Sequence, residues 1–315
     1  MEQPSAFTFV LQAQPESGEA WGQLATTAEA AGYAALVVPD HPGLTHSPFV
    51  ALAAVAAPTS TLQLGTAVIN CGVRNPLDVA ADVATLDVLS DGRALLGLGA
   101  GHTPSEWSTL GLDYPSPAER IARLAEFTDV VPALLAGESV TYTGRHVSLT
   151  AASLKAHPHT PVPLLIGGNN ARLLTLAARR ADIVELSGTG KTLPDGHRHQ
   201  ARWSEEDIDR AVGIVKAAAQ KEGRDPVMSA LVQSVVITDD AERATNEWLV
   251  AGSRSVPPEL LPSVADALAA PYTLIGTVSE IITKIHRLGD RWGFARYTIR
   301  DTTAGANVLE AANAV

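Results

Sequence analysis

Short apolar runs recur at regular intervals along the chain and constrain its fold more than any other feature. Eight such runs are FTFVLQA (7–13), ALVVPD (35–40), LQLGTAVI (62–69), ALLGLGAG (94–101), PLLIGG (163–168), IVELSG (183–188), LVQSVVI (231–237) and RYTIRD (296–301). Several lack the alternation of apolar and polar residues that marks a strand with one solvated face. Such runs are typical of parallel strands that are covered on both faces.

Amphipathic segments lie between these runs. Their spacing predicts helices over residues 19–32, 116–137, 207–223 and 278–293. In the second of these, Ser116, Pro117 and Glu119 occupy the N-cap, N1 and N3 positions, which marks a helix start. Repeated strand and helix units favour a closed (β/α)₈ barrel, a TIM barrel of the α/β class, over an open doubly wound sheet. We predict a single domain over residues 1–315.

Composition excludes several classes of protein. A formal net charge of -11 argues against general binding to nucleic acid, which requires a basic surface. No uncharged run is long enough to span a bilayer, and the N-terminal residues lack the pattern of a secretory leader. A single cysteine, Cys71, excludes an internal disulfide and suits a reducing compartment. We therefore expect a cytoplasmic protein without a membrane or nucleic-acid partner.

Polar residues follow the predicted strands, and in a TIM barrel the chemistry lies at these carboxyl ends. The residues are Asp40 and His41 after the second strand, Asn70, Cys71 and Arg74 after the third, His102, Glu106 and Trp107 after the fourth, and Glu185 and Ser187 in the sixth. Two histidines at neighbouring strand ends indicate a redox or acid/base pocket. Cys71 is interpreted as a small buried apolar residue, because no basic partner that would lower its pKa is evident.

The nonapeptide IGGNNARLL (166–174) joins the fifth strand to a helical run. A helix that begins directly after two glycines presents free N–H groups and the positive end of its dipole, which suits a phosphate or carboxylate. The same residues also fit an ordinary turn, in which glycine allows the chain to turn tightly and asparagine caps the helix. Residues alone leave both interpretations open.

Other motifs carry less chemistry. GLGAG (97–101) lacks the third glycine of a dinucleotide fingerprint, so it indicates close backbone approach at a strand end. The pairs His157/His159 and His197/His199 have no carboxylate or cysteine at ligand spacing, and we predict no metal site. Residues 140–149 are predicted to form a small hairpin.

Two long loops, 187–203 and 251–272, are rich in glycine, proline and charge. They follow the sixth and seventh predicted strands, where a lid or a substrate wall would lie. The first contains Lys191, Arg198 and Arg202, which are either partners for an acidic ligand or solvated loop charges.

Several segments resemble the luciferase-like monooxygenase superfamily, and within it the actinobacterial branch of coenzyme F420-dependent oxidoreductases. The resemblance covers nearly the whole chain and is carried by LGTAVINCGVRNPLDVAADVATLDVLSDGRALLGLGAG, ERIARLAEF, VPLLIGGNNARLLTLAARRADIV and YTLIGTVSEIITKI. It implies a TIM barrel that binds a flavin or the deazaflavin F420, usually as a homodimer. It also implies that the cofactor phosphate lies at Gly167, Gly168, Asn169 and Asn170, which favours the anion site over the ordinary turn.

The resemblance implies further site residues. A non-prolyl cis peptide is expected at Ala67-Val68, at the end of the third strand, where it would form a bulge behind the cofactor ring together with Asn70 nearby. Asp40 and His41 match a strand-two pair that lies beside the ring or the substrate. The alternative is that Asp40 caps the following turn and that His41 is a surface histidine.

His102 departs from the pattern of the F420-dependent sugar-phosphate dehydrogenases, which carry an acidic glutamate after the GxG of strand four. This difference argues against oxidation of glucose 6-phosphate and places an imidazole near the ring. We predict His41 and His102 as the catalytic residues. In the alternative, His102 only forms a hydrogen bond within its loop.

The function implied is the transfer of hydride from F420H₂ to a C=C or C=N bond of an organic substrate. The substrate is expected to be a small molecule, such as a specialised metabolite, or a modified peptide that contains dehydroamino acids. One alternative is an FMN-dependent monooxygenase that works with a partner flavin reductase. Another is a non-catalytic flavin-binding protein.

Overall fold

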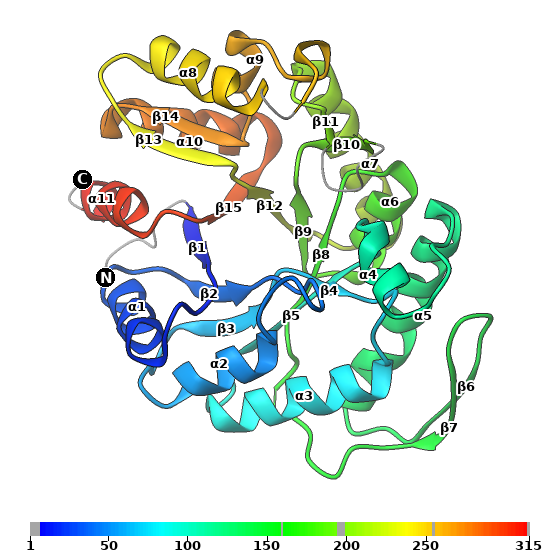
Figure 1. The fold of residues 1–315 in the computed structure, drawn as a ribbon. Coiled ribbons are helices and arrows are strands. Elements are labelled where there is room, and N and C mark those ends of the chain that lie inside the picture. The colour runs from blue at the N-terminus through cyan, green and yellow to red at the C-terminus, as the bar shows by residue number, and fades with distance from the viewer. Residues whose placement is uncertain (1–6, 159, 194–198, 254–255, 314–315) are drawn as a thin grey trace.

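The architecture is a parallel β-barrel surrounded by helices (Figure 1). The computed structural model describes residues 7–158, 160–193, 199–253 and 256–313. The barrel strands are β1 (Thr8–Gln12), β2 (Ala35–Val38), β3 (Gln63–Thr66), β5 (Ala94–Gly99), β8 (Leu164–Gly167), β9 (Ile183–Leu186), β12 (Val227–Leu231) and β15 (Phe294–Ile299). Pairing of β1 with β15 and of β3 with β5 closes the ring, and the short β4 (Ile69–Asn70) extends the edge beside β5. The predicted TIM-like barrel is therefore confirmed.

Helices follow most of the strands, as the sequence predicts. They are α1 (Gly18–Ala30), α2 (Pro48–Ala56), α3 (Pro76–Leu89), α4 (Pro104–Thr109), α5 (Pro117–Leu135), α6 (Ala171–Arg180), α7 (Glu205–Lys221), α8 (Ala241–Ser253), α9 (Val264–Ala269), α10 (Val278–Trp292) and α11 (Thr302–Asn313). The predicted start of α5 is confirmed, since Ser116 and Glu119 form a reciprocal capping box. Gly293 ends α10 in the left-handed conformation (φ 86°), which glycine adopts without strain.

The prediction of the seventh strand is wrong. Residues 231–237 were expected in the barrel, but the barrel strand is β12, which ends at Leu231. Residues Ser234–Ile237 form β13, which pairs in parallel with β14 (Thr273–Gly276) outside the barrel. β-branched residues are favoured in any β-sheet. Strand propensity therefore favours residues 231–237 over Val227–Leu231 but does not show which of the two segments enters the barrel.

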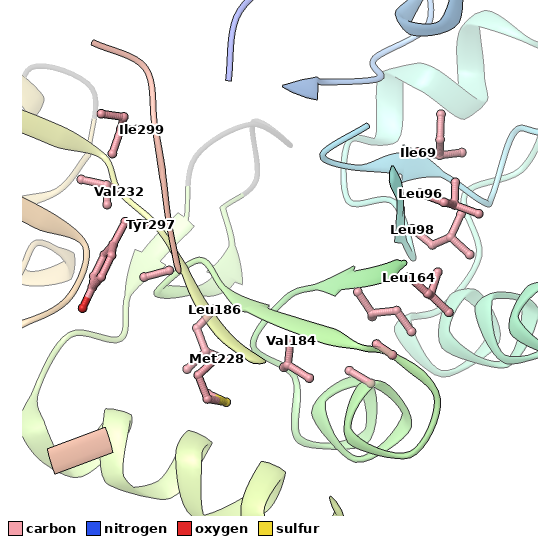
Figure 2. Packing of buried hydrophobic residues seen from close by; sticks show 14 of the residues in the cluster. Ile69, Leu96, Leu98, Leu164, Val184, Leu186, Met228, Val232, Tyr297 and Ile299 are labelled. Atoms are coloured by element: carbon pink, nitrogen blue, oxygen red, sulfur yellow. The ribbon is translucent and has the colours of Figure 1, made fainter. Parts of the chain in front are cut away.

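The main core fills the space between the strands and the surrounding helices. Figure 2 shows part of it, including Leu96, Leu98 and Leu164 on neighbouring strands. A smaller cluster of apolar side chains fills the barrel interior: Val10, Ala35, Val37, Ala67, Leu95, Leu165 and Ile183. Because the interior is closed by packed side chains, a ligand must bind above them, at the ends of the strands.

Glycines let the third and fourth barrel strands approach closely. A Cβ atom on Gly97 would lie 2.1 Å from the carbonyl oxygen of Thr66, and one on Gly99 would lie 2.5 Å from Val68 Cγ2. The interpretation of GLGAG as a close backbone approach is confirmed. The bulge that lies against these glycines contains the Ala67-Val68 peptide bond, which is cis, as the family resemblance implied.

The inserted segments differ in their relation to the barrel mouth. The predicted hairpin is present as β6 (Val140–Thr143) and β7 (Ser148–Ala152). In the first long loop, β10 (Thr189–Thr192) pairs with β11 (His199–Ala201). The second holds η1 (Pro258–Leu260), which packs against β11, and α9. In the described parts of the chain, no helix is long and apolar enough to cross a membrane.

Candidate functional site

A cavity of about 620 Å³ opens at the carboxyl ends of the barrel strands. All the predicted site residues line it: Asp40, His41, Ala67, Val68, Asn70, His102, Gly167, Gly168, Asn169 and Asn170. The β10–β11 hairpin contributes Thr189 and His199 to the wall, whereas no described residue of 251–272 lines the cavity. The described part of the first long loop therefore lines the candidate site. The second long loop contacts the first through η1, which packs against β11.

Asp40 anchors the end of the third strand. Its buried carboxylate accepts hydrogen bonds from Arg74 Nη2 (2.6 Å) and Nε (3.1 Å) and from the backbone N–H of Asn70 (3.2 Å). The paired donors of a guanidinium match a carboxylate well, so this contact fixes both residues. Asp40 thus joins strands two and three rather than capping its own turn.

His41 forms an ion pair inside the cavity wall. Its Nδ1 lies 2.6 Å from Glu106 Oε1, and the side chains are 34% and 1% exposed. The hydrogen bond that His41 donates to Glu106 raises the pKa of His41 above its ordinary value and outweighs the opposing effect of burial. Burial would raise the pKa of Glu106, but hydrogen bonds from His41 and Asn70 lower it. The pairing therefore favours the protonated form of His41 and makes this residue part of the cavity wall rather than a surface histidine.

His102 has a different environment. Its ring centroid lies 5.8 Å from that of His41 and 4.9 Å from that of His199. Burial lowers the pKa of His102 to about 4, and the neighbouring His199 and His41 lower it in the same direction. The backbone carbonyl of His102 accepts a hydrogen bond from Tyr114 Oη (2.9 Å). This contact joins the His102 loop to the segment that precedes α5. The cavity thus places an imidazole whose pKa is raised beside one whose pKa is lowered.

The turn between β8 and α6 offers unpaired groups to a ligand. No hydrogen bond joins the backbone N–H groups of Asn169, Asn170 or Ala171 to another described residue. Gly168 has a φ of 151°, a conformation that side chains rarely adopt. Asn169 donates to the Thr189 carbonyl (2.9 Å), while its buried Oδ1 has no partner among the described residues. The turn fits a phosphate on its N–H groups and a ligand hydroxyl on Asn169 Oδ1.

A polar network forms the floor of the cavity. Gln12 Nε2 donates to the carbonyl oxygen of Ala67 (2.8 Å), and Arg300 Nε donates to Gln12 Oε1 (2.8 Å). Glu185 is buried, and it accepts hydrogen bonds from Ser229 Oγ (3.0 Å) and Thr298 Oγ1 (2.5 Å). Burial raises the pKa of Glu185 despite these contacts and the nearby Arg296. Sequence reasoning missed Gln12, Ser229, Thr298 and both arginines, although each lies on a strand or, for Arg300, directly after one.

The charges around the cavity are unbalanced. Asp40 is paired with Arg74, Glu106 with His41, and Glu185 is faced by Arg296. Arg120 donates to the carbonyls of Gly101 and Pro115 (2.9 and 2.6 Å) and lies over the Tyr114 ring, and Arg300 donates to glutamine side chains. Arg296 and Arg300 both face the single carboxylate of Glu185, and no described acidic side chain pairs with Arg120. This excess of positive charge favours an anionic ligand in a chain of net charge -11.

Some predicted features have no role in the cavity. Cys71 is buried, and burial raises its thiol pKa, which agrees with its interpretation as a packed apolar residue. Arg202 pairs with Asp207 at 3.4 Å, while Arg198, His159 and His197 lie outside the described residues. No group of metal-ligating side chains is present in the described part of the chain. His199 was considered only as a possible metal ligand, and its place in the wall follows from the fold of the hairpin.

The chain matches one protein family along most of its length. The model of that family, described as luciferase-like monooxygenase, matches residues 5–296, so the chain belongs to this family. The F420-dependent glucose-6-phosphate dehydrogenase of Nakamurella multipartita is 29% identical over 276 residues, which are 84% of this chain and 77% of the relative. The 5,10-methylenetetrahydromethanopterin reductase of Archaeoglobus fulgidus is 26% identical over 87% of this chain and 76% of its own length.

Other curated relatives match over shorter segments. The F420-dependent glucose-6-phosphate dehydrogenase of Beutenbergia cavernae is 37% identical over 175 residues, about half of each chain. Among solved structures, the F420-dependent tetrahydromethanopterin reductase of Methanopyrus kandleri superimposes with a TM-score of 0.76 and 20% identity, over 98% of this chain and 97% of the other. The monooxygenase RslO1 of Streptomyces bottropensis gives the same TM-score and identity, over 98% of both chains. These two structures establish the shared fold.

Proposed function

We propose that this protein is an oxidoreductase that uses the deazaflavin F420. The observation that carries the proposal is the cavity itself, in which a turn with unpaired N–H groups and two strand-end histidines face the same space. A relative named as an F420-dependent dehydrogenase matches 84% of the chain, and others with F420 in their names match about half of it. F420 carries a phosphate and an acidic tail, which the α6 turn and the positive charge excess would accommodate.

The residues present fit such a cofactor. Gly167, Gly168 and the N–H groups of Asn169 and Asn170 would hold its phosphate, and the bulge at Ala67 and Val68 would support its ring. Reduced F420, when bound, supplies a hydride. The chain contributes the rest: it orients an acceptor against the ring and holds a proton for the other atom of the bond.

We propose a C=C or C=N bond of an organic molecule or modified peptide as the acceptor. His41 and His102 lie in the wall where a substrate would meet the cofactor ring, and His41 carries a proton held by Glu106. Histidine replaces the acidic residue expected after GxG in the sugar-phosphate dehydrogenases. We therefore do not propose glucose 6-phosphate as the substrate, although relatives that act on it are similar.

The test is a paired titration of the apoprotein with F420 and with FMN. Binding is followed through the fluorescence of each cofactor, and we expect saturable binding of F420 with a dissociation constant at least tenfold lower than that of FMN. Mixing the F420H₂ complex with unsaturated acceptors under anaerobic conditions should then restore the absorbance of oxidised F420.

The reverse preference would replace the proposal with its alternative, an FMN-dependent monooxygenase that requires a flavin reductase. Binding of F420 without hydride transfer to any acceptor would indicate a non-catalytic flavin-binding protein. Failure to bind either cofactor would refute all three functions.

A further inference from the structure

Glu106 is a carboxylate buried in the wall of the candidate site, and the resemblance gave it no role. It lies in the first turn of α4, which begins at Pro104 after the His102 loop. Its two oxygens have different partners: Oε1 meets His41 Nδ1 at 2.6 Å, and Oε2 accepts from Asn70 Nδ2. With its side chain 1% exposed, Glu106 is separated from bulk solvent.

The partners of Glu106 are themselves held in place. Asn70 Oδ1 accepts a hydrogen bond from the backbone N–H of Gly72 (2.9 Å), and the Asn70 N–H donates to Asp40. Gly101 packs against the same amide, because a Cβ there would lie 2.2 Å from Asn70 Oδ1. Glu106 therefore has one fixed position, and the imidazole of His41 is fixed through it.

We propose that Glu106 is a positioning residue that holds His41 as an imidazolium and leaves its Nε2 proton for the substrate. The inference rests on the proposed reduction. Reduced F420, when bound, would supply the hydride for one end of the substrate double bond and release its remaining proton to solvent. The proton of His41 Nε2 would form the bond to the other end, so that the π bond is lost and His41 becomes neutral. Solvent returns the proton through the exposed part of the imidazole.

The groups around His41 support this division of roles. Glu106 on α4 and the adjacent Asp40 favour the imidazolium, although Arg74 neutralises Asp40. His102, from the loop after β5, faces His41 but remains neutral and does not repel it. The neutral imidazole of His102 is suited to a hydrogen bond with the substrate, whereas the cationic one of His41 is suited to proton donation.

The experiment replaces Glu106 with glutamine and measures the titration of His41 by NMR in the cofactor-free protein. Glutamine keeps the size of the side chain but removes the charge, so the pKa of His41 should fall by about one to two units. The signal of His41 is assigned by its loss in His41→Gln. Glu106→Asp should retain part of the elevation, and Glu138→Gln, which changes an exposed carboxylate, should leave the titration unchanged.

The second readout is the pH dependence of turnover. His41 loses its proton as the pH rises through its pKa, so turnover should fall on the alkaline side. Glu106→Gln should move that fall to lower pH by as much as it lowers the pKa of His41 in the NMR titration. The affinity of the variant for F420 should change less than threefold.

An unchanged His41 titration in a Glu106→Gln variant with native circular dichroism would overturn the proposal. If Glu106→Gln does not fold, Glu106→Ala, which also removes the charge, supplies the same measurement, and an unchanged titration there has the same meaning. Because the NMR titration needs no cofactor, it separates this inference from the proposed function.

Discussion

At the residue scale, identical side chains acquire different properties from their neighbours. His41 and His102 both follow barrel strands, yet one meets a carboxylate at 2.6 Å and the other lies among imidazoles. Their pKa values move in opposite directions for this reason, upward for His41 and to about 4 for His102. A pair of histidines in one cavity thus provides an acid and a neutral hydrogen-bonding group at the same pH.

Replacing His102 with asparagine tests its contribution to turnover. Asparagine retains a short polar side chain but cannot reproduce the imidazole contact, so turnover should fall about tenfold to a hundredfold, the effect of losing one buried hydrogen bond. The dissociation constant of F420, measured by fluorescence, should change less than threefold. Unchanged turnover would mean that His102 serves only its own loop.

The pH profile provides a control for this variant. Because the pKa of His102 is lowered to about 4, it should contribute no inflection between about pH 5 and 9. His102→Asn should therefore lower turnover at every pH in this range without moving the alkaline fall assigned to His41. A shifted fall would contradict the assignment of separate roles.

At the element scale, the start of α6 determines whether the cavity binds an anion. Asn170 caps this helix by accepting the N–H of Arg172 (2.9 Å), which leaves the preceding N–H groups without a described partner. Gly168 allows the backbone to enter the turn at a φ of 151°. The cap and the proposed anion site thus use different groups of one turn, and capping by asparagine is compatible with a phosphate there.

Gly168→Ala should weaken cofactor binding. The added Cβ would lie 3.0 Å from Leu173 Cδ2 in a conformation that alanine rarely adopts, so the turn must shift. We expect the dissociation constant for F420 to rise about tenfold, as measured by the same fluorescence titration. Equal affinity would show that the phosphate binds elsewhere.

Gly213→Ala is the matched control. Gly213 lies within α7, and a Cβ there would meet no atom within 4 Å. Alanine in an exposed helix interior should raise the free energy of unfolding by about 0.5 to 1 kcal/mol and leave cofactor affinity unchanged.

At the scale of the whole molecule, we propose that two chains form a homodimer, as the family resemblance implied. Val50 on α2 is 72% exposed, and Val88 and Leu89 at the end of α3 are 55% and 52% exposed. These two helices contact each other and lie side by side (Figure 1). Large apolar side chains exposed on adjacent helices are typical of a surface that associates with another protein.

Sedimentation velocity should give the mass of a dimer at micromolar concentration. Val50→Glu places a charge on an exposed position that the folded monomer tolerates, so it should shift the distribution toward the monomer with native circular dichroism. A monomeric wild-type protein would contradict the proposal, and an unaffected dimer in the variant would place the interface on another surface.

The sequence by itself determined the barrel, most of its strands and the turn that begins α6, because apolar periodicity, caps and glycines act over a few residues. The strand ends also identified Asp40, His41 and His102, since parallel strands bring their carboxyl ends to one edge. Only the tertiary structure decided that β12 rather than residues 231–237 enters the barrel, that Glu106 holds His41, and that His199 and Arg300 reach the same cavity. These contacts join residues that are far apart in the chain, and their energies depend on burial and on partners that no local pattern contains.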